Sequence, residues 1–262
     1  MSDKLKERFI AENGQHAWTE GWQSLLNLSP ELFEASLNLR SIPKKKRHLP
    51  PKVQHFVSIA VDSASTHLHV PGIEEHIKAA LKEGATPAEV MEVIELTSTL
   101  GIHACNIGVP LLMEVLREEG LYDKHPTAGA PLDERREKLK AEFTEKRGYW
   151  HEFWEDFLKL DPEFFEGYLK FSSVPWIKDP AGDGKGKGVL EPKIKELIYC
   201  AFDAAATHLY QPGLKLHMRN AIRYGATPEE IMEVLEIATL LSLHTATVAA
   251  PILEREINNS SY

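Results

Sequence analysis

The chain has 262 residues, of which 43% are hydrophobic and 26% are charged, as in an ordinary folded globular protein. Its formal net charge of −9 argues against nucleic-acid partners and against binding to anionic membranes, because both need a basic face. No stretch approaches the ~20 apolar residues of a membrane helix, and the charged N-terminus predicts no signal peptide. Two cysteines cannot make a disulfide framework, so we expect a reduced, cytoplasmic protein.

Apolar residues recur at helical spacing along the chain, and no run with strand periodicity lies between hairpin turns. In chain order, helices are expected at 16–27, 30–40, 51–68, 73–83, 87–97 and 101–118. Pro71-Gly72 is expected to break the chain between the third and fourth of these. Thr86, Pro87 and Glu89 predict a capping box with proline in the first turn. The fold class is therefore all-α, with two helical bundles packed together.

The chain contains an internal duplication, which decides its predicted organisation. Residues 52–110 repeat at 193–251 without a gap, and 23 of these 59 positions are identical. The preceding part also repeats, with Trp18 matching Trp150 and Trp22 matching Trp154. The change of offset places extra residues at 176–190, where the glycine-rich run 179–188 predicts a surface loop. Two repeats follow, at 1–125 and 130–262.

The repeated polar residues predict a functional site. A single histidine in an apolar helix is more often a hydrogen-bonded core residue, but three repeated pairs favour a site, because burying polar groups without purpose is costly. Histidine also transfers protons near neutral pH. We expect a pocket in each repeat, with the turn at Pro71-Gly72 bringing His67 close to His76. The candidate catalytic residues are His76, His217, His67, His208, His103, His244, Asp62 and Asp203.

A metal site is the alternative use of these side chains. His67, His76 and His103 with Asp62 would form a set of three histidines and one carboxylate, as in some zinc or iron sites. The chain has no standard ligand spacing such as H-E-x-x-H, so metal-free acid–base chemistry is preferred and no cofactor is expected. The basic run 44–47 is interpreted as a solvated face that could also steer an anionic substrate.

The run from His76 to Val93 resembles the signature of the carboxymuconolactone decarboxylase family. It reads H-x-x-x-A-x-x-x-G-x-T-x-x-E, then a hydrophobic residue, x and E, and the run from His217 to Val234 repeats it. The superfamily also contains the alkyl hydroperoxidase D proteins. The resemblance implies two tandem alkyl hydroperoxidase D-like bundles, an active site near His76 and His217, and a homo-oligomer, either a dimer or a trimer of two-repeat chains.

The sequence departs from the family pattern in two places, and these departures reduce the range of reactions that the resemblance implies. The peroxidase branch carries C-x-x-C-x-x-x-H, but its cysteine positions hold His69 and Gly72 here, and Tyr210 and Gly213 in the second repeat. Without a dithiol there is no redox nucleophile, so a peroxidase is not expected. The decarboxylase branch usually reads Y-x-G-x-P after the signature helix. A histidine stands at the proline position in both repeats.

The resemblance implies a decarboxylase or related lyase for a small unsaturated acid or lactone of aromatic-compound catabolism, working without a cofactor. His76 and His217 would donate the proton, and the other histidines would stabilise developing charge. Two alternatives stay open. One is a metal-dependent hydrolase or C–C lyase that uses the histidine cluster. The other is a non-catalytic protein that binds small acids.

Overall fold

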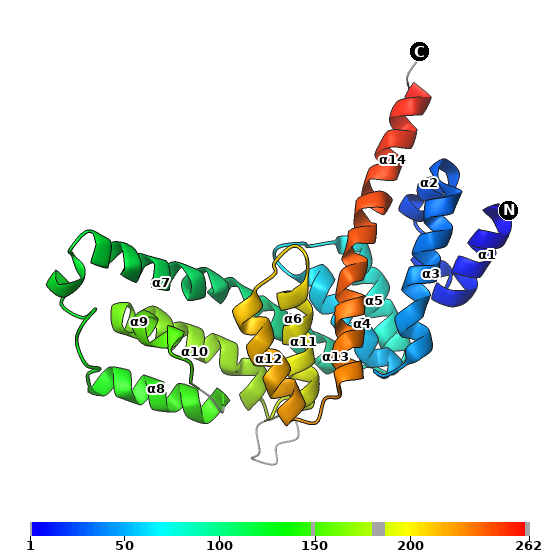
Figure 1. Cartoon of the computed structure of the whole chain (residues 1–262). Helices are drawn as coiled ribbons and strands as arrows, with labels where there is room; N and C mark the ends of the chain where they lie inside the picture. Colours follow the sequence, from blue (N-terminus) through cyan, green and yellow to red (C-terminus); the bar gives the residue numbers. More distant parts are fainter. Residues whose placement is uncertain (1, 148–149, 180–186, 260–262) are drawn as a thin grey trace. The chain divides into compact units, whose positions relative to one another are not determined.

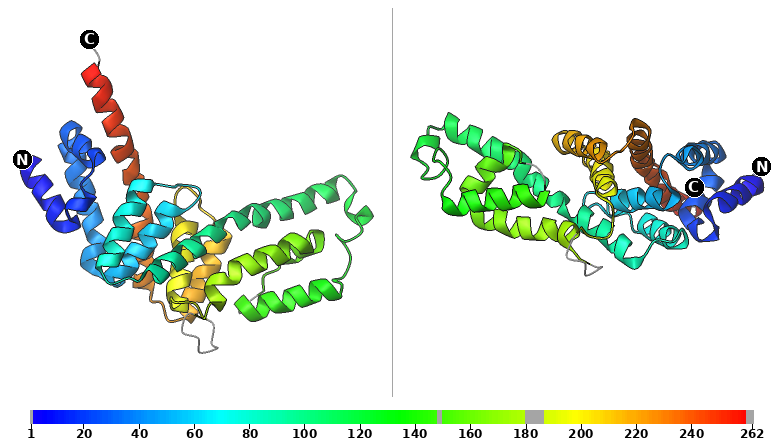
Figure 2. Two further views of the ribbon diagram at one scale, coloured as in Figure 1. Left: turned by 180° about the vertical axis from the view of Figure 1, so that it is seen from behind. Right: turned by 90° about the horizontal axis from the view of Figure 1, so that it is seen from below.

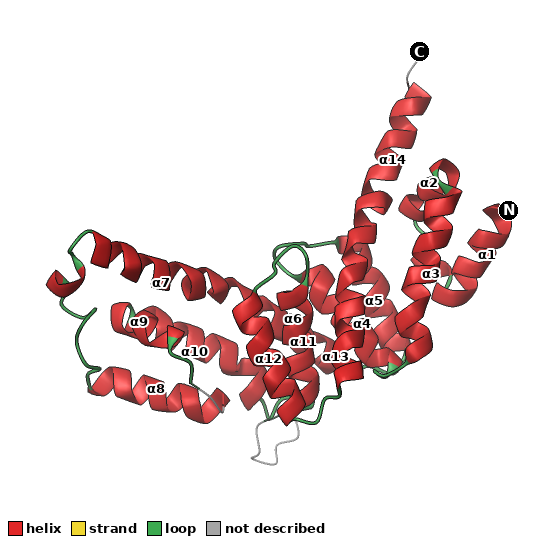
Figure 3. Cartoon of the chain, in the orientation of Figure 1, coloured by secondary structure: helices red, strands yellow, loops and turns green. Residues whose placement is uncertain are grey.

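The computed structural model describes residues 2–147, 150–179 and 187–259, and every regular element in those ranges is a helix (Figure 3). The predicted all-α fold class is confirmed. The helices divide into two compact units, one made of 1–97 and 192–262, the other of 98–191. The predicted glycine-rich loop at 179–188 lies mostly outside the described residues.

The first unit combines N-terminal and C-terminal parts of the chain (Figure 1). Its elements are α1 (Ser2–Asn13), η1 (Gln15–Ala17), α2 (Glu20–Leu28), α3 (Pro30–Lys46), α4 (Pro51–Ser63), α5 (Val70–Lys82), α6 (Pro87–Thr97), α11 (Pro192–Ala204), α12 (Gln211–Arg223), α13 (Pro228–Thr239), η4 (Leu240–Ser242) and α14 (Leu243–Asn259). The second unit contains η2 (Ser98–Ile102), α7 (His103–Glu118), η3 (Tyr122–Lys124), α8 (Glu134–Arg147), α9 (Phe153–Leu160) and α10 (Pro162–Ile177).

The compact units do not follow the two sequence repeats at 1–125 and 130–262. The last helix of each repeat packs against the first helices of the other repeat: α14 lies along α2 in both views of Figure 2, and α7 packs against α9. Gly21 allows the close approach of α2 to α14, because a Cβ at this position would lie 2.2 Å from the carbonyl oxygen of Thr247. Each unit therefore contains helices from both repeats.

Aromatic clusters form the cores of these exchanged regions. In the first unit, Phe9, Trp22 and Phe33 are buried together and the cluster reaches Ala250 on α14. In the second unit, Phe143, Trp154 and related side chains form a similar cluster with α7. Burying a large aromatic side chain contributes on the order of 2–3 kcal/mol, so these clusters favour the exchanged packing.

Two buried glutamates at matching positions join the repeats within the first unit. Glu92 on α6 forms an ion pair of 2.9 Å with Lys195 on α11, and both side chains are fully buried. Glu233 on α13 accepts a hydrogen bond of 2.7 Å from Gln54 on α4. Gln54 and Lys195 occupy the same position of the two repeats, so each repeat donates from that position to the glutamate of the other.

The helices differ from expectation in several places: neither α1 nor α8 was predicted, and the helix expected at 16–27 begins at Glu20. The helix expected over 51–68 ends at Ser63, and the break comes at 64–69 rather than at Pro71-Gly72. Pro71 instead lies in the first turn of α5, where the missing N–H needs no partner. The capping box is present: the Glu89 amide donates to the Thr86 hydroxyl at 3.2 Å, and the Thr86 amide to the Glu89 carboxylate at 2.7 Å.

We expected no segment with the length and apolar composition of a membrane-spanning helix, and this expectation was wrong. The helical segments Pro87–Glu118 and Pro228–Asn259 both pass that test, each with 28% of its most apolar window buried. These segments begin with α6 and α13, which carry core residues such as Val93 and Val234. A core helix of a soluble protein passes the same test. The later parts, α7 and α14, carry exposed apolar residues such as Leu111 and Leu253.

The buried Lys195–Glu92 pair predicts a specific stability defect. Lys195→Ala leaves Glu92 buried without its ammonium partner, so the free energy of unfolding should fall by about 3–5 kcal/mol. Lys195→Gln recreates the glutamine–glutamate pair of Gln54 and Glu233 and should lose less. Chemical denaturation of both variants measures the difference, and equal losses would contradict this account of the pair.

Candidate functional site

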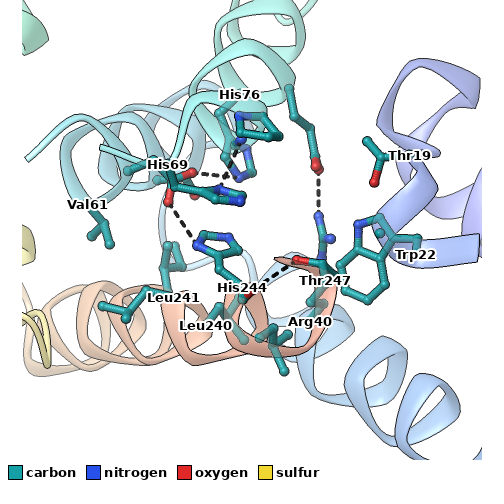
Figure 4. A pocket seen from close by; sticks show the side chains of 18 of the residues that line it. Thr19, Trp22, Arg40, Val61, His69, His76, Leu240, Leu241, His244 and Thr247 are labelled. Atoms are coloured by element: carbon teal, nitrogen blue, oxygen red, sulfur yellow. Dashed lines mark hydrogen bonds and ion pairs between the residues drawn. The ribbon is translucent and has the colours of Figure 1, made fainter. Parts of the chain in front are cut away.

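A cavity of about 360 Å³ lies inside the first unit. Its walls come from α2, α3, α4, the start of α5, and the region where α13 passes through η4 into α14. Figure 4 shows His69, His76 and His244 on one side of this space, and Arg40 beside Trp22 on the other. The cavity thus has imidazoles on one wall and a guanidinium on the other.

Asp62 is the centre of the imidazole wall. Its side chain is 3% exposed, and its Oδ1 lies 3.9 Å from His67 Nε2 and 3.6 Å from His244 Nδ1. Its Oδ2 lies 3.9 Å from His76 Nε2. The chain turns sharply after Ser63, with Leu68 in the left-handed region at φ 48°, and this turn returns His67 to Asp62. His67 and His76, which the sequence predicted to approach each other, thus each lie 3.9 Å from an oxygen of the same carboxylate.

His244 comes from α14, in the second repeat. Its Nδ1 lies 2.8 Å from His67 Nε2, and its ring stacks on His69 with centroids 3.6 Å apart. The sequence placed the corresponding His103, not His244, in the pocket of the first repeat. That expectation was wrong for the first unit, because α14 packs on α2 and brings its own histidine to Asp62.

His76 has a second imidazole partner. Its Nδ1 lies 3.2 Å from Nδ1 of His55, two turns before Asp62 on α4. One of these two nitrogens donates the hydrogen and the other accepts it. His76 therefore links His55 on one side to Asp62 on the other.

A cationic group faces the imidazoles. Arg40 binds the Glu75 carboxylate at 2.6 Å, and its guanidinium lies 5.0 Å from the Trp22 ring centroid. Lys44, one turn further along α3, donates to the Asn13 side chain at 2.6 Å. Since Arg40 is neutralised by Glu75, Lys44 supplies the net positive charge on this wall.

Burial dominates the electrostatics of the imidazole wall. Desolvation lowers the pKa of His76 to about 3 and that of His55 to about 4. It lowers the pKa of His244 to about 3 and, with the neighbouring His67, that of His69 to about 4. Desolvation and the charge of Glu75 raise the pKa of Asp62 to about 8. The wall is therefore uncharged near neutral pH.

The cationic wall, unlike the imidazole wall, carries charged groups at neutral pH. Burial would raise the pKa of Glu75, but the charges of Arg40 and His76 and the hydrogen bond from Arg40 lower it to about 2. Burial and the charge of Arg40 lower the pKa of Lys44 to about 8. Glu75 is therefore fully ionised at neutral pH, and Lys44 loses its charge in mildly alkaline solution.

In the second repeat the matching histidines and aspartate have different neighbours. His217 Nδ1 lies 2.6 Å from the Glu196 carboxylate, and its ring stacks on Tyr199 with centroids 4.4 Å apart. Burial raises the pKa of Asp203 to about 7, and His208 is half-buried beside Tyr210. His103 begins α7 in the second unit, where it is buried.

Sequence comparison between the repeats missed several cavity residues. His55, Arg40 and Glu75 are replaced by Glu196, Ser172 and Leu216 at the corresponding positions, so no repeated identity marked them. The sequence predicted a solvated face for the basic run 44–47, but Lys44 is partly buried and lines the cavity.

Gly72 predicts how tightly the site is packed. A Cβ at this position would lie 2.2 Å from Asp62 Oδ2 and 2.7 Å from His69 Nδ1, so Gly72→Ala should displace both side chains. We expect a lower melting temperature for Gly72→Ala. Gly167→Ala is the matched control, because its Cβ meets nothing within 4 Å on a helix, where alanine is favoured. An unchanged melting temperature of Gly72→Ala would contradict this packing.

Known proteins resemble this chain over its whole length. The model of the carboxymuconolactone decarboxylase family matches residues 30–103 and 180–254. A crystal structure from Burkholderia xenovorans LB400, described as a "putative gamma-carboxymuconolactone decarboxylase subunit", is 49% identical with a TM-score of 0.90. The match covers 100% of this chain and 99% of that one. No curated protein matches the chain. The chain belongs to the carboxymuconolactone decarboxylase family and carries two such domains in tandem.

Proposed function

We propose that the chain is a decarboxylase or related lyase for a small unsaturated carboxylic acid or lactone of aromatic-compound catabolism, and that it needs no organic cofactor. The single observation that carries this proposal is the composition of the cavity in the first unit. A space of about 360 Å³ suits a small molecule and lies between a cationic wall and an imidazole wall. The description of the similar Burkholderia protein supports the same reaction class.

The two walls divide the chemistry. Lys44 and Arg40 hold a substrate carboxylate by charge-assisted hydrogen bonds. Loss of CO₂ breaks a C–C bond and leaves its electron pair delocalised into the conjugated carbonyl group, where the imidazole wall stabilises the negative charge. The proton for carbon passes through His76: as its uncharged imidazole gives up one ring proton, it takes another from the protonated carboxyl of Asp62, which is reprotonated from solvent. His55 orients the ring of His76.

We further propose a homo-oligomer, a dimer or trimer of two-repeat chains, as the family resemblance implied, in the cytoplasmic location expected from the composition. The exposed apolar residues of α14 support it, because such faces on soluble proteins commonly meet a partner. They are Val248, Ile252, Leu253 and Ile257. A monomeric mass in light scattering at micromolar concentration would contradict this proposal.

The central test is a set of histidine variants assayed with unsaturated lactone acids. His76→Ala should lower kcat by about 10²–10⁴-fold, the usual contribution of a positioned acid–base group. His16→Ala, an exposed histidine outside the cavity, should have no effect. A His217→Ala variant measured in the same assay shows how much of the activity depends on the second repeat. Wild-type kcat in His76→Ala, or loss in His217→Ala alone, would place the reaction elsewhere.

Lys44 predicts the pH dependence of substrate binding. Its folded pKa of about 8 lies below the ordinary value of 10.5, so its charge is present below pH 8 and is lost as the pH rises through that value. KM for an anionic substrate should therefore rise above pH 8. Lys44→Met should raise KM about 10-fold at neutral pH, the cost of losing a charge-assisted hydrogen bond, and remove this pH dependence. The exposed Lys45→Met is the control. An unaltered pH profile of KM in Lys44→Met would exclude Lys44 as the anchor.

A further inference from the structure

We propose that Asp62, His67 and His244 bind one divalent transition-metal ion. These residues form a set of two histidines and one carboxylate, and Asp62 and His244 both line the cavity. Such a set occupies one face of the ion and leaves coordination positions open for water or substrate. The proposal concerns metal binding and stands independently of the reaction proposed above.

The three ligand atoms already form a compact triangle. Asp62 Oδ1 lies 3.6 Å from His244 Nδ1 and 3.9 Å from His67 Nε2, and the two nitrogens are 2.8 Å apart. An ion with bonds of about 2.0–2.2 Å needs neighbouring ligand atoms about 3–3.4 Å apart. Small side-chain rotations therefore suffice, and the ion replaces the hydrogen bond between the two imidazoles.

The carboxylate lacks other compensation for its burial. Asp62 is 2% exposed, and within the described part of the chain its ion-pair contacts are all with histidines. Its Oδ2 has no hydrogen-bond partner among those residues. Ionising a buried carboxyl group without a cation or hydrogen-bond donors is costly, and a divalent ion at Oδ1 would supply the positive charge that the ionised form needs.

Neighbouring groups hold the two imidazoles in place. The turn after α4 holds His67 beside Asp62, because the His67 amide donates to the Ala64 carbonyl at 2.8 Å. Leu68 follows at φ 48°, a conformation disfavoured for leucine, and the His69 amide then donates to the Asp62 carbonyl at 2.9 Å. His69 stacks flat on His244, and its Nδ1 accepts a hydrogen bond of 3.1 Å from the Gly72 amide. The candidate ligand atoms of Asp62, His67, His69 and His244 all lie within 4.8 Å of one another. Because the His69 ring lies flat on His244 and orients it, we assign His69 as a positioning residue for His244.

All three proposed ligands recur at the matching positions of the other repeat. Asp62, His67 and His244 each have an identical residue at the matching position of the other repeat, namely Asp203, His208 and His103. His55 and His69 do not, because Glu196 and Tyr210 stand there. The triad, together with His76 and its counterpart His217, is therefore the part of the histidine cluster that both repeats retain, while His55 and His69 occur in the first repeat only.

The experiment uses the full chain without a histidine tag, stripped of metal with a chelator and titrated with Co²⁺. Visible ligand-field absorption and elemental mass spectrometry after desalting report binding. We expect the wild type to retain Co²⁺, and His67→Ala and His244→Ala each to bind one equivalent fewer per chain. Loss of a ligand should weaken affinity at that site by at least ~100-fold, more than loss of an outer-shell partner.

His55→Ala is the matched control, because His55 lies in the same cavity but contacts His76 instead of the triad. It should bind as much Co²⁺ as the wild type. Since a variant could fold poorly, the wild type is also melted with and without Co²⁺, which should raise the melting temperature. The proposal is overturned if the wild type retains no Co²⁺, or if His67→Ala and His244→Ala retain the wild-type amount.

Discussion

The buried carboxylate of Glu233 on α13 holds three walls of the cavity in register. It accepts hydrogen bonds from the backbone amides of His48 and Leu49, where α3 passes into α4, and from the Gln54 side chain. A buried carboxylate must be paired in this way or it destabilises the fold. Because α3 carries the cationic residues, α4 the central aspartate, and α13 leads into the helix of His244, one side chain sets their relative positions.

Within that frame, the exchange of terminal helices decides the chemistry of the site. A histidine of the second repeat completes a cluster whose carboxylate belongs to the first. The cationic wall comes from α3, which is packed on the aromatic cluster of the N-terminal helices. The same contacts therefore determine stability and site geometry, because the aromatic core that packs against α14 also holds His244 beside Asp62.

The sequence predicted most of the helices, though not α1 or α8, together with the duplication and part of the cluster. The periodicity and the capping residues around Thr86 are local signals, and local signals survive in the fold. Identity between repeats pointed to Asp62, His67 and His76, which the structure brings together. It could not reveal His55 or Arg40, which occur in one repeat only. Nor could it tell exchanged from unexchanged last helices, because two similar repeats give the same local pattern in either case.

The exchange also changes what duplication makes possible. If single repeats assembled as identical subunits, every substitution would appear at every site at once. Joining the two repeats in one chain lets one site change while the other keeps its residues, and the short connection keeps the exchanged helices at high effective concentration. Two matching positions show such differences: His55 corresponds to Glu196, and His69 corresponds to Tyr210. The covalent link has thus turned a symmetric assembly into one whose two halves can specialise separately.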